Sequence, residues 1–253
     1  MKKLVLALSV IFAVTTSYIT IDKTVNNTEP KYIVEKSTEK EATTLPENEI
    51  KTLSAAETLY QKIDFSNINK LNYEVFEKAF TGFNNLKAAG KIDENTKLLT
   101  VADFSLSSNT KRLWVIDTES GEILFNSLVA HGKNTGEEFA TKFSNIESSY
   151  QSSLGFYVTD VTYTGENGYS LRLLGMDAGY NDAALQRAIV MHGADYVSET
   201  FAAQHKRIGR SWGCPAVPRA LAEPIINTIK GKNVLFIYYP DENYLNTSKW
   251  LNA

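Results

Sequence analysis

Cysteine is nearly absent from this chain, since Cys214 is the only one among 253 residues. A single cysteine excludes an internal disulfide and every metal site built on paired Cys-x-x-Cys ligands. Histidine is scarce as well, with three residues and no His-x-x-x-His spacing. A zinc site made of Cys214 and the histidines would have only widely spaced ligands, and it is the weaker interpretation of these residues.

Strong charge and long apolar runs are also missing. The net charge is −3 and no block of Lys or Arg stands out, which argues against a nucleic-acid partner. Beyond the N-terminal region no segment is apolar enough to span a bilayer. The remaining chain is long enough for one sizeable domain with its own core.

The N-terminus has the features of an export signal. Lys2 and Lys3 precede an apolar stretch over residues 4–14, which is the order found in signal peptides. We predict a signal peptide over residues 1–21. Because no A-x-A cleavage pattern follows the apolar stretch, an uncleaved membrane anchor is the alternative. Both predict an exported protein of the periplasm or cell envelope, and the second adds a membrane tether.

The next segment, residues 22–53, is rich in Thr, Glu, Lys and Asn and has few large apolar side chains. Such a segment is too polar to collapse onto a core. We predict a flexible polar tether that holds a folded unit away from the membrane or export site. A disordered tail without function is the alternative.

Residues 54–93 predict a small helical segment. Ser54 and Glu57 have the spacing of a capping box at the start of a short helix. Asn72 then precedes a longer stretch, 73–89, in which apolar residues recur at helical spacing. An amphipathic helix of this kind is expected to pack on the main domain.

Residues 94–245 predict a mainly β domain with a few short helices. Short β-rich runs alternate with turns, and we expect strands at 98–104, 112–117, 123–129, 155–163, 170–174, 188–192 and 234–239. Helices are expected at 181–186 and 218–230, and residues 246–253 form a C-terminal tail. The polar stretch 132–154 is long for a loop inside a compact domain, which favours a functional role.

The lone cysteine lies in a turn whose sequence, residues 210–215, reads Arg-Ser-Trp-Gly-Cys-Pro. A thiol becomes a nucleophile when a nearby base favours its thiolate, and histidine is the usual base. His192 lies 22 positions upstream. Glycine at position 213 lets the backbone turn sharply, so that its N–H groups are free to stabilise an oxyanion. The alternative is a buried structural thiol.

At these residues the chain resembles the L,D-transpeptidase catalytic-domain family of bacterial cell-wall enzymes. That family carries His-Gly at the end of a strand and a later Ser/Thr-His-Gly-Cys turn. Here His192-Gly193 and Ser211-Trp212-Gly213-Cys214 hold those positions, and the resemblance covers roughly residues 98–239, including the blocks 128–134, 142–145 and 152–157. Trp212 departs from the pattern, because it stands where the family has histidine, and an indole only donates.

The resemblance implies a β-sandwich with the cysteine loop beside a cleft. Cys214 would attack the carbonyl between the third residue of a peptidoglycan stem peptide and its terminal D-alanine, with His192 as base and the Gly193 backbone orienting the imidazole. The amides of Gly213 and Cys214 would form the oxyanion hole. The acyl group would pass to an amine of a second stem, giving a 3–3 cross-link. No cofactor is implied.

Further residues are expected to contact substrate: Trp212, Ser211, Arg210, Tyr196, Arg172 and His131. The two arginines are candidates to hold a substrate carboxylate; solvation of Arg210 and a structural salt bridge of Arg172 are the alternatives. We expect a monomer. Two other functions stay open. One is L,D-carboxypeptidase hydrolysis of the same bond, and the other is wall binding by a catalytically silent domain.

Overall fold

The computed structural model describes residues 52–253. The predicted signal peptide or anchor and nearly all of the predicted tether therefore lie outside the described residues. Within residues 52–253 no helix is both long enough and apolar enough to cross a membrane.

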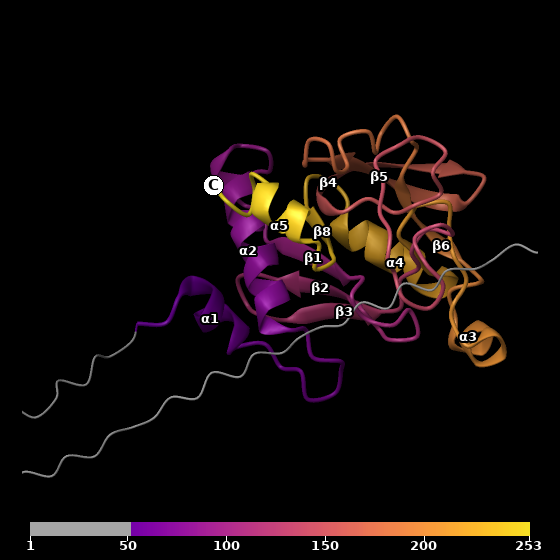
Figure 1. The fold of residues 1–253 in the computed structure, drawn as a ribbon. Helices are drawn as coiled ribbons and strands as arrows, with labels where there is room; N and C mark the ends of the chain where they lie inside the picture. The colour runs from indigo at the N-terminus through magenta and orange to yellow at the C-terminus, as the bar shows by residue number, and fades with distance from the viewer. Residues whose placement is uncertain (1–51) are drawn as a thin grey trace, which may run out of the picture. The chain divides into compact units, whose positions relative to one another are not determined.

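The described domain is mainly β, as the sequence predicts. Eight strands form one hydrogen-bonded sheet in the order β3-β2-β1-β8-β4-β5-β6-β7 (Figure 1). Their bounds are β1 Leu98–Asp103, β2 Leu113–Asp117, β3 Ile123–Ser127, β4 Gly155–Gly165, β5 Gly168–Gly175, β6 Val190–Ala194, β7 Ala216–Pro218 and β8 Val234–Tyr238.

This sheet curves until its two edges almost meet. Ala130 follows the edge strand β3, and its amide donates to the carbonyl of Ala216 in the other edge strand, β7, over 2.8 Å. Gly132 forms a second bridge, to Ser211. The predicted sandwich is thus one continuous, nearly closed sheet, and its closure brings the loop after β3 next to the cysteine turn.

Two helices at the start of the domain follow their capping signals. α1, Ala55–Tyr60, begins with the predicted capping box of Ser54 and Glu57. α2, Tyr73–Ala88, begins at Asn72, whose side chain accepts from the Glu74 amide. α2 lies against β1 and β8 and buries the predicted apolar face.

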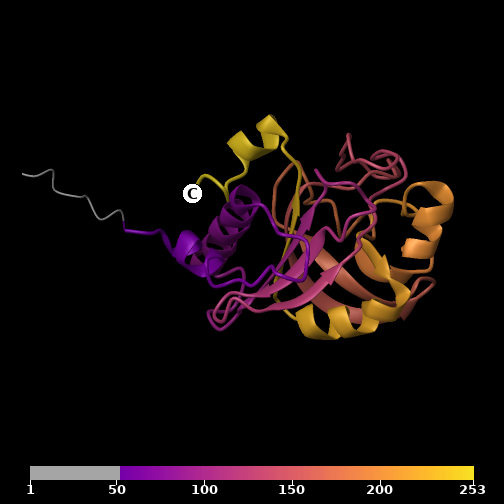
Figure 2. The same cartoon turned by 90° about the horizontal axis from the view of Figure 1, so that it is seen from below.

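Three more helices complete the domain: α3 Glu199–His205, α4 Arg219–Ile229 and α5 Glu242–Thr247. α4 packs on β5, β6 and β7, and Figure 2 shows it at a separate place around the sheet from α2. Strands buried on both faces read as continuous apolar runs, which is the pattern of β8, all five of whose residues are buried.

The helix expected at 181–186 is not formed; this segment is a series of turns. Asn181 explains the difference, because its side-chain oxygen accepts from the Asp177 amide over 2.8 Å. Asp177 in turn accepts from the Phe156 amide over 2.7 Å. Side chains that bond to the backbone in this way compete with helix formation.

The C-terminal residues 246–253 pack against the same turns. Trp250 is 4% exposed, and its indole donates to the Met176 carbonyl over 2.7 Å. The Ser248 hydroxyl donates to the Asp177 carboxylate over 2.6 Å. This end of the chain is therefore part of the core.

Candidate active site

A cleft of about 590 Å³ lies beside the cysteine turn. It is bounded by three parts of the chain: the turn itself, β6 with the residues just before it, and the tip of the β4–β5 hairpin. Six of the residues singled out from the sequence line it: Cys214, His192, Trp212, Ser211, Arg210 and Tyr196.

Strand pairing brings the cysteine and the histidine together. β6 and β7 run parallel, with His192 opposite Ala216. Cys214 lies two residues before Ala216, just as Val190 lies two residues before His192, so Cys214 comes beside the start of β6. The Val190 amide in β6 donates to the Cys214 sulfur over 3.5 Å, which holds the thiol against the strand that carries His192.

The His192 imidazole is neutral and has one nitrogen free to act as base. Its side chain is 4% exposed, and Nδ1 lies 3.2 Å from the Gly193 carbonyl oxygen. A carbonyl can only accept, so Nδ1 carries the proton and Nε2 the lone pair. Burial, and secondarily the charge of Arg219, lower the pKa of His192, which keeps the ring unprotonated at neutral pH.

Gly193 also allows α4 to approach. A Cβ built on Gly193 would lie 2.8 Å from the Ala222 side chain of α4. No larger residue fits there without movement of the helix, so the glycine after the histidine fixes β6 against α4 as well as presenting its carbonyl to the imidazole.

The Cys214 thiol needs a base. Burial raises the pKa of Cys214, while the Val190 amide and the charge of Arg187 act in the opposite direction without overcoming it. A thiol with a raised pKa carries little thiolate at neutral pH. The neutral imidazole in the same cleft is the group able to take its proton.

Hydroxyl groups hold the cysteine turn in shape. Gly213 has φ +125°, a conformation that only glycine adopts without strain. Its amide donates to the Ser211 hydroxyl over 3.1 Å, and that hydroxyl donates to the Cys214 carbonyl over 2.6 Å. The Gly213 amide, expected to be an oxyanion donor, is thus engaged within the turn, and the Cys214 amide remains the candidate donor.

Comparison with known proteins gives the family. The profile of the L,D-transpeptidase catalytic domain matches residues 67–238, which include α2, all eight strands and the cleft. The chain belongs to the L,D-transpeptidase catalytic-domain family. A search of curated proteins returned no match.

Comparison with solved structures returned matches at low sequence identity. An L,D-transpeptidase from Mycobacterium smegmatis is 13% identical, with a TM-score of 0.35 over 57% of this chain and 59% of that chain. The helical cell shape determining protein Pgp2 from Campylobacter jejuni is 13% identical, with a TM-score of 0.37 over 65% of this chain and 57% of that chain. This chain therefore spans about three-fifths of the length of the solved chains that it matches.

Trp212 lies on the rim of the L,D-transpeptidase cleft. Its side chain is 73% exposed, and its ring centre lies 5.5 Å from that of Tyr150 at a tilt of 56°. Tyr196 lies deeper: a Cβ on Gly209 would be 2.4 Å from its side chain. Burial, with a smaller effect from the neighbouring Cys214, raises the pKa of Tyr196 to about 12.

Arg210 points its guanidinium into the long loop after β3. It donates to the Gly136 carbonyl over 2.9 Å and to the Glu137 carboxylate over 2.7 Å, and it also reaches the Lys133 carbonyl over 3.1 Å. These contacts tie the cysteine turn to the loop. A substrate carboxylate would have to compete with Glu137 for this side chain.

His131 and Arg172 do not line the cleft. His131 is 1% exposed; its Nδ1 accepts from Arg112 over 2.8 Å, and its Nε2 donates to the Glu137 carbonyl over 3.1 Å. Burial and the charge of Arg112 lower the pKa of His131 to about 4. His131 therefore supports the loop from beneath, which corrects its expected contact with substrate.

Arg187 is a cleft residue that sequence reasoning missed. Its guanidinium donates to the carbonyls of Ser144 and Gln151 over 2.8 and 2.7 Å and to the hydroxyls of Ser149 and Ser153. One arginine thus organises the polar loop beside the thiol. A lone arginine after a turn carries no motif, so only the fold reveals this role.

Metal ligands do not gather in the described domain. Among residues 52–253 no group of three or more His, Cys, Asp or Glu side chains is placed to hold a metal ion. The three histidines belong to different parts of the fold, since His205 lies in α3 with its ring stacked on Phe201, and His131 lies under the loop.

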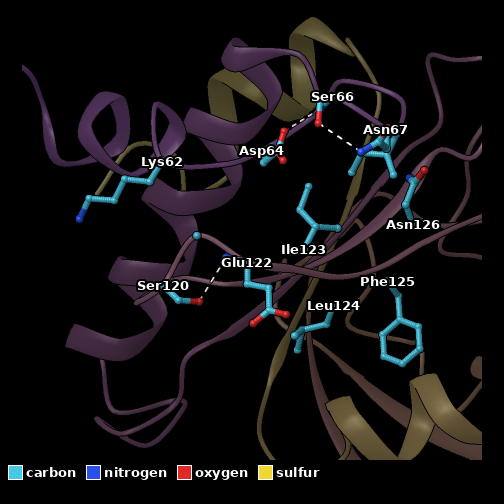
Figure 3. Close-up of a pocket in the computed structure, with 12 residues that line it drawn as sticks. Lys62, Asp64, Ser66, Asn67, Ser120, Glu122, Ile123, Leu124, Phe125 and Asn126 are labelled. Carbon is cyan, nitrogen blue, oxygen red and sulfur yellow. Dashed lines mark hydrogen bonds between the residues drawn. The ribbon is translucent and has the colours of Figure 1, made fainter.

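A second groove, of about 520 Å³, lies between residues 62–68 and residues 120–126, which form the turn after β2 and most of β3 (Figure 3). Figure 3 shows Ile123 directed toward Ser66 and Asn67, while Leu124 and Phe125 point away. The groove shares no lining residue with the cleft of Cys214, so it takes no part in the candidate active site.

Proposed function

We propose that this chain is an exported L,D-transpeptidase that cross-links peptidoglycan through an acyl-enzyme on Cys214. The observation that carries the proposal is the meeting of Cys214 and the neutral His192 in one cleft of an L,D-transpeptidase domain. The proposed substrate is a stem peptide ending in D-alanine. The protein acts as a monomer in the cell envelope, directed there by residues 1–21.

In the first half-reaction His192 takes the thiol proton on Nε2 and the Cys214 sulfur attacks the carbonyl of the third stem residue. The Cys214 amide donates to the developing oxyanion. The C–N bond to the terminal D-alanine then breaks, and the imidazolium returns its proton to the leaving amine. The product is a thioester on Cys214 and free D-alanine.

In the second half-reaction an amine of another stem peptide attacks the thioester. The C–S bond breaks, the sulfur leaves as thiolate, and the proton lost by the amine passes through His192 back to sulfur. Both steps use groups that this chain supplies, namely one nucleophile, one base and a backbone donor. Water in place of the amine would give a trimmed tripeptide stem.

The test is product analysis by liquid chromatography and mass spectrometry after incubation with defined tetrapeptide-stem muropeptides. We expect release of D-alanine together with a cross-linked dimer, and neither with Cys214→Ala. Formation of tripeptide stems without a dimer would show that the protein is an L,D-carboxypeptidase and not a transpeptidase. Muropeptides that remain unchanged would indicate a catalytically silent wall-binding domain.

A further inference from the structure

The β4–β5 hairpin ends in a tight turn at the edge of the cleft. Gly165 pairs with Gly168, which leaves Glu166 and Asn167 as the only two turn residues. Gly168 has φ +79° and neither turn residue has a positive φ, which is the pattern of a type I turn followed by a left-handed glycine. Because the paired strands continue up to this turn, the backbone positions of Glu166 and Asn167 are fixed.

Three residues of this hairpin line the cleft, Tyr163, Glu166 and Asn167, and we call them the hairpin wall. The Tyr163 ring is braced from two sides. The Arg172 guanidinium lies 5.4 Å from its centre, and a Cβ on Gly165 would be 2.8 Å from its edge. Arg172, expected to clamp a carboxylate, here supports the hairpin wall.

Glu166 gives this wall a negative charge. It is the only carboxylate among the described residues that line the cleft, whose cationic residues are Arg187 and Arg210. Both arginines are already engaged, Arg210 with Glu137 and Arg187 with the loop after β3. Within residues 52–253 no Lys, Arg or His nitrogen lies within 4.0 Å of the exposed Glu166 carboxylate.

We propose that Glu166 forms the subsite for the acceptor amine, binding the ammonium group of the second stem peptide. This rests on the proposed function, since it needs a thioester on Cys214. A primary amine is an ammonium ion at neutral pH and is attracted to a carboxylate at the mouth of the cleft. On moving to the thioester it gives one proton to water, its nitrogen forms the new C–N bond as the C–S bond breaks, and its second proton passes through His192 to the leaving sulfur.

The polarity of the cleft fits this assignment. The donor stem approaches with a terminal carboxylate, which the charge of Arg187 favours on the side of the residues preceding β6. The acceptor approaches with a cation, which Glu166 favours on the hairpin side. Donor and acceptor would then reach Cys214 from different walls, and the side chain that distinguishes an amine from water is Glu166.

The experiment compares wild type, Glu166→Gln and Glu166→Asp, with Glu223→Gln on the exposed side of α4 as the matched control. Acylation is followed by intact mass with a donor muropeptide alone. Aminolysis is followed by cross-linked product against the concentration of an acceptor stem that carries a free amine. An acceptor acetylated on that amine gives the background.

For Glu166→Gln, after correction for any change in the acylation rate, we expect the acceptor KM to rise about fivefold. This is the upper end for an exposed ion pair. Glu166→Asp recovers part of this loss, and Glu223→Gln matches wild type. Added salt weakens acceptor binding by wild type but has less effect on Glu166→Gln.

An unchanged acceptor KM in Glu166→Gln, or equal losses in acylation and aminolysis, would overturn the subsite while leaving the transpeptidase intact. Absence of any acyl-enzyme in wild type would instead remove the proposed function and the subsite with it. The two failures are therefore distinguishable from the acylation measurement alone.

Discussion

At the scale of single residues, the reactivity of Cys214 depends on a proton acceptor. Burial raises the pKa of the thiol, and burial also keeps His192 neutral, with Nε2 as the free base. The same desolvation therefore makes the thiol a poor nucleophile alone and the histidine a suitable partner. The Gly193 carbonyl fixes which nitrogen performs this role.

We predict that His192→Ala makes Cys214 react slowly with iodoacetamide at neutral pH and moves the midpoint of its pH profile upward. The base lost in this variant is the group that favours the thiolate, and general bases contribute about 10²–10⁴-fold to turnover. The measurement is the alkylation rate from pH 5 to 10. His205→Ala, in an exposed helix, is the control; a profile of His192→Ala that coincides with this control would exclude His192 as base.

Trp212 should affect substrate and loop position while leaving the thiol titration alone. Its indole cannot accept a proton and rests on Tyr150 at the cleft rim. We predict that Trp212→Ala lowers the acylation rate strongly, because misplacement of about 1 Å can cost about 100-fold. Trp212→His should retain more activity. A shifted alkylation profile with normal acylation would show the opposite role.

At the scale of elements, the joint between α2 and the sheet depends on one glycine. A Cβ on Gly82 would lie 2.0 Å from the Phe156 ring. Phe156 is fully buried and stacks on Phe236 with ring centres 4.2 Å apart, so the ring has little room to move. Glycine costs helix propensity at this position, and close packing of α2 on β4 requires it.

Gly82→Ala should therefore destabilise the domain although alanine favours helix by about 1 kcal/mol. Overpacking of a buried aromatic ring outweighs this gain, and we expect a net loss of about 2 kcal/mol in the free energy of unfolding. Urea titration measures it. The double variant with Phe156→Leu should lose less than the sum of the two single variants; strict additivity would show that the methyl group does not meet the ring.

The elements that the sequence predicts well are those with local signals. The capping box of α1, the periodic face of α2 and the β-rich runs each carry their own pattern. β7, with three residues, and the short helix α3 have too little sequence for a pattern. The segment 181–186 was predicted wrongly, because the bonds of Asn181 reach strand β4 and no local rule anticipates them.

Some residues of the candidate site can be predicted from the sequence, and others only from the fold. Cys214 and His192 could be found from residue type and motif, and both line the cleft. Arg187, Tyr163 and Glu166 come from segments that only the folded sheet brings to the cleft, so their chemistry has no signature in the chain. His131 was misplaced because a histidine followed by glycine looks the same in sequence whether it faces a cleft or a buried arginine.

At the scale of the whole molecule, closure of the sheet places a buried charged cluster beneath the loop after β3. Arg112 is fully buried and donates to the Val129 carbonyl and to His131. The pKa of Arg112 falls to about 9 through burial, and that of His131 to about 4. Protonation of His131 would set a second positive charge against Arg112.

The free energy of unfolding should therefore decrease as the pH is lowered from about 6.5 to about 4. In this range the histidine of the unfolded chain binds a proton and folded His131 does not. The contribution is fully present above about pH 6.5 and amounts to about 3 kcal/mol for a shift of this size. We predict that the stability difference between wild type and His131→Asn shrinks as pH falls through this range in urea titrations. Asp103 and Asp177 titrate in both proteins and cancel. A difference that stays constant with pH would contradict this.

The most direct test of the cysteine mechanism is the intact mass of the protein after brief incubation with a tetrapeptide-stem muropeptide. We expect wild type to gain the mass of the donor less D-alanine and to lose it on treatment with hydroxylamine, as a thioester does. Cys214→Ala, folded and otherwise unchanged, should gain nothing. Release of D-alanine by Cys214→Ala, or an adduct carried by any residue other than Cys214, would contradict the cysteine mechanism.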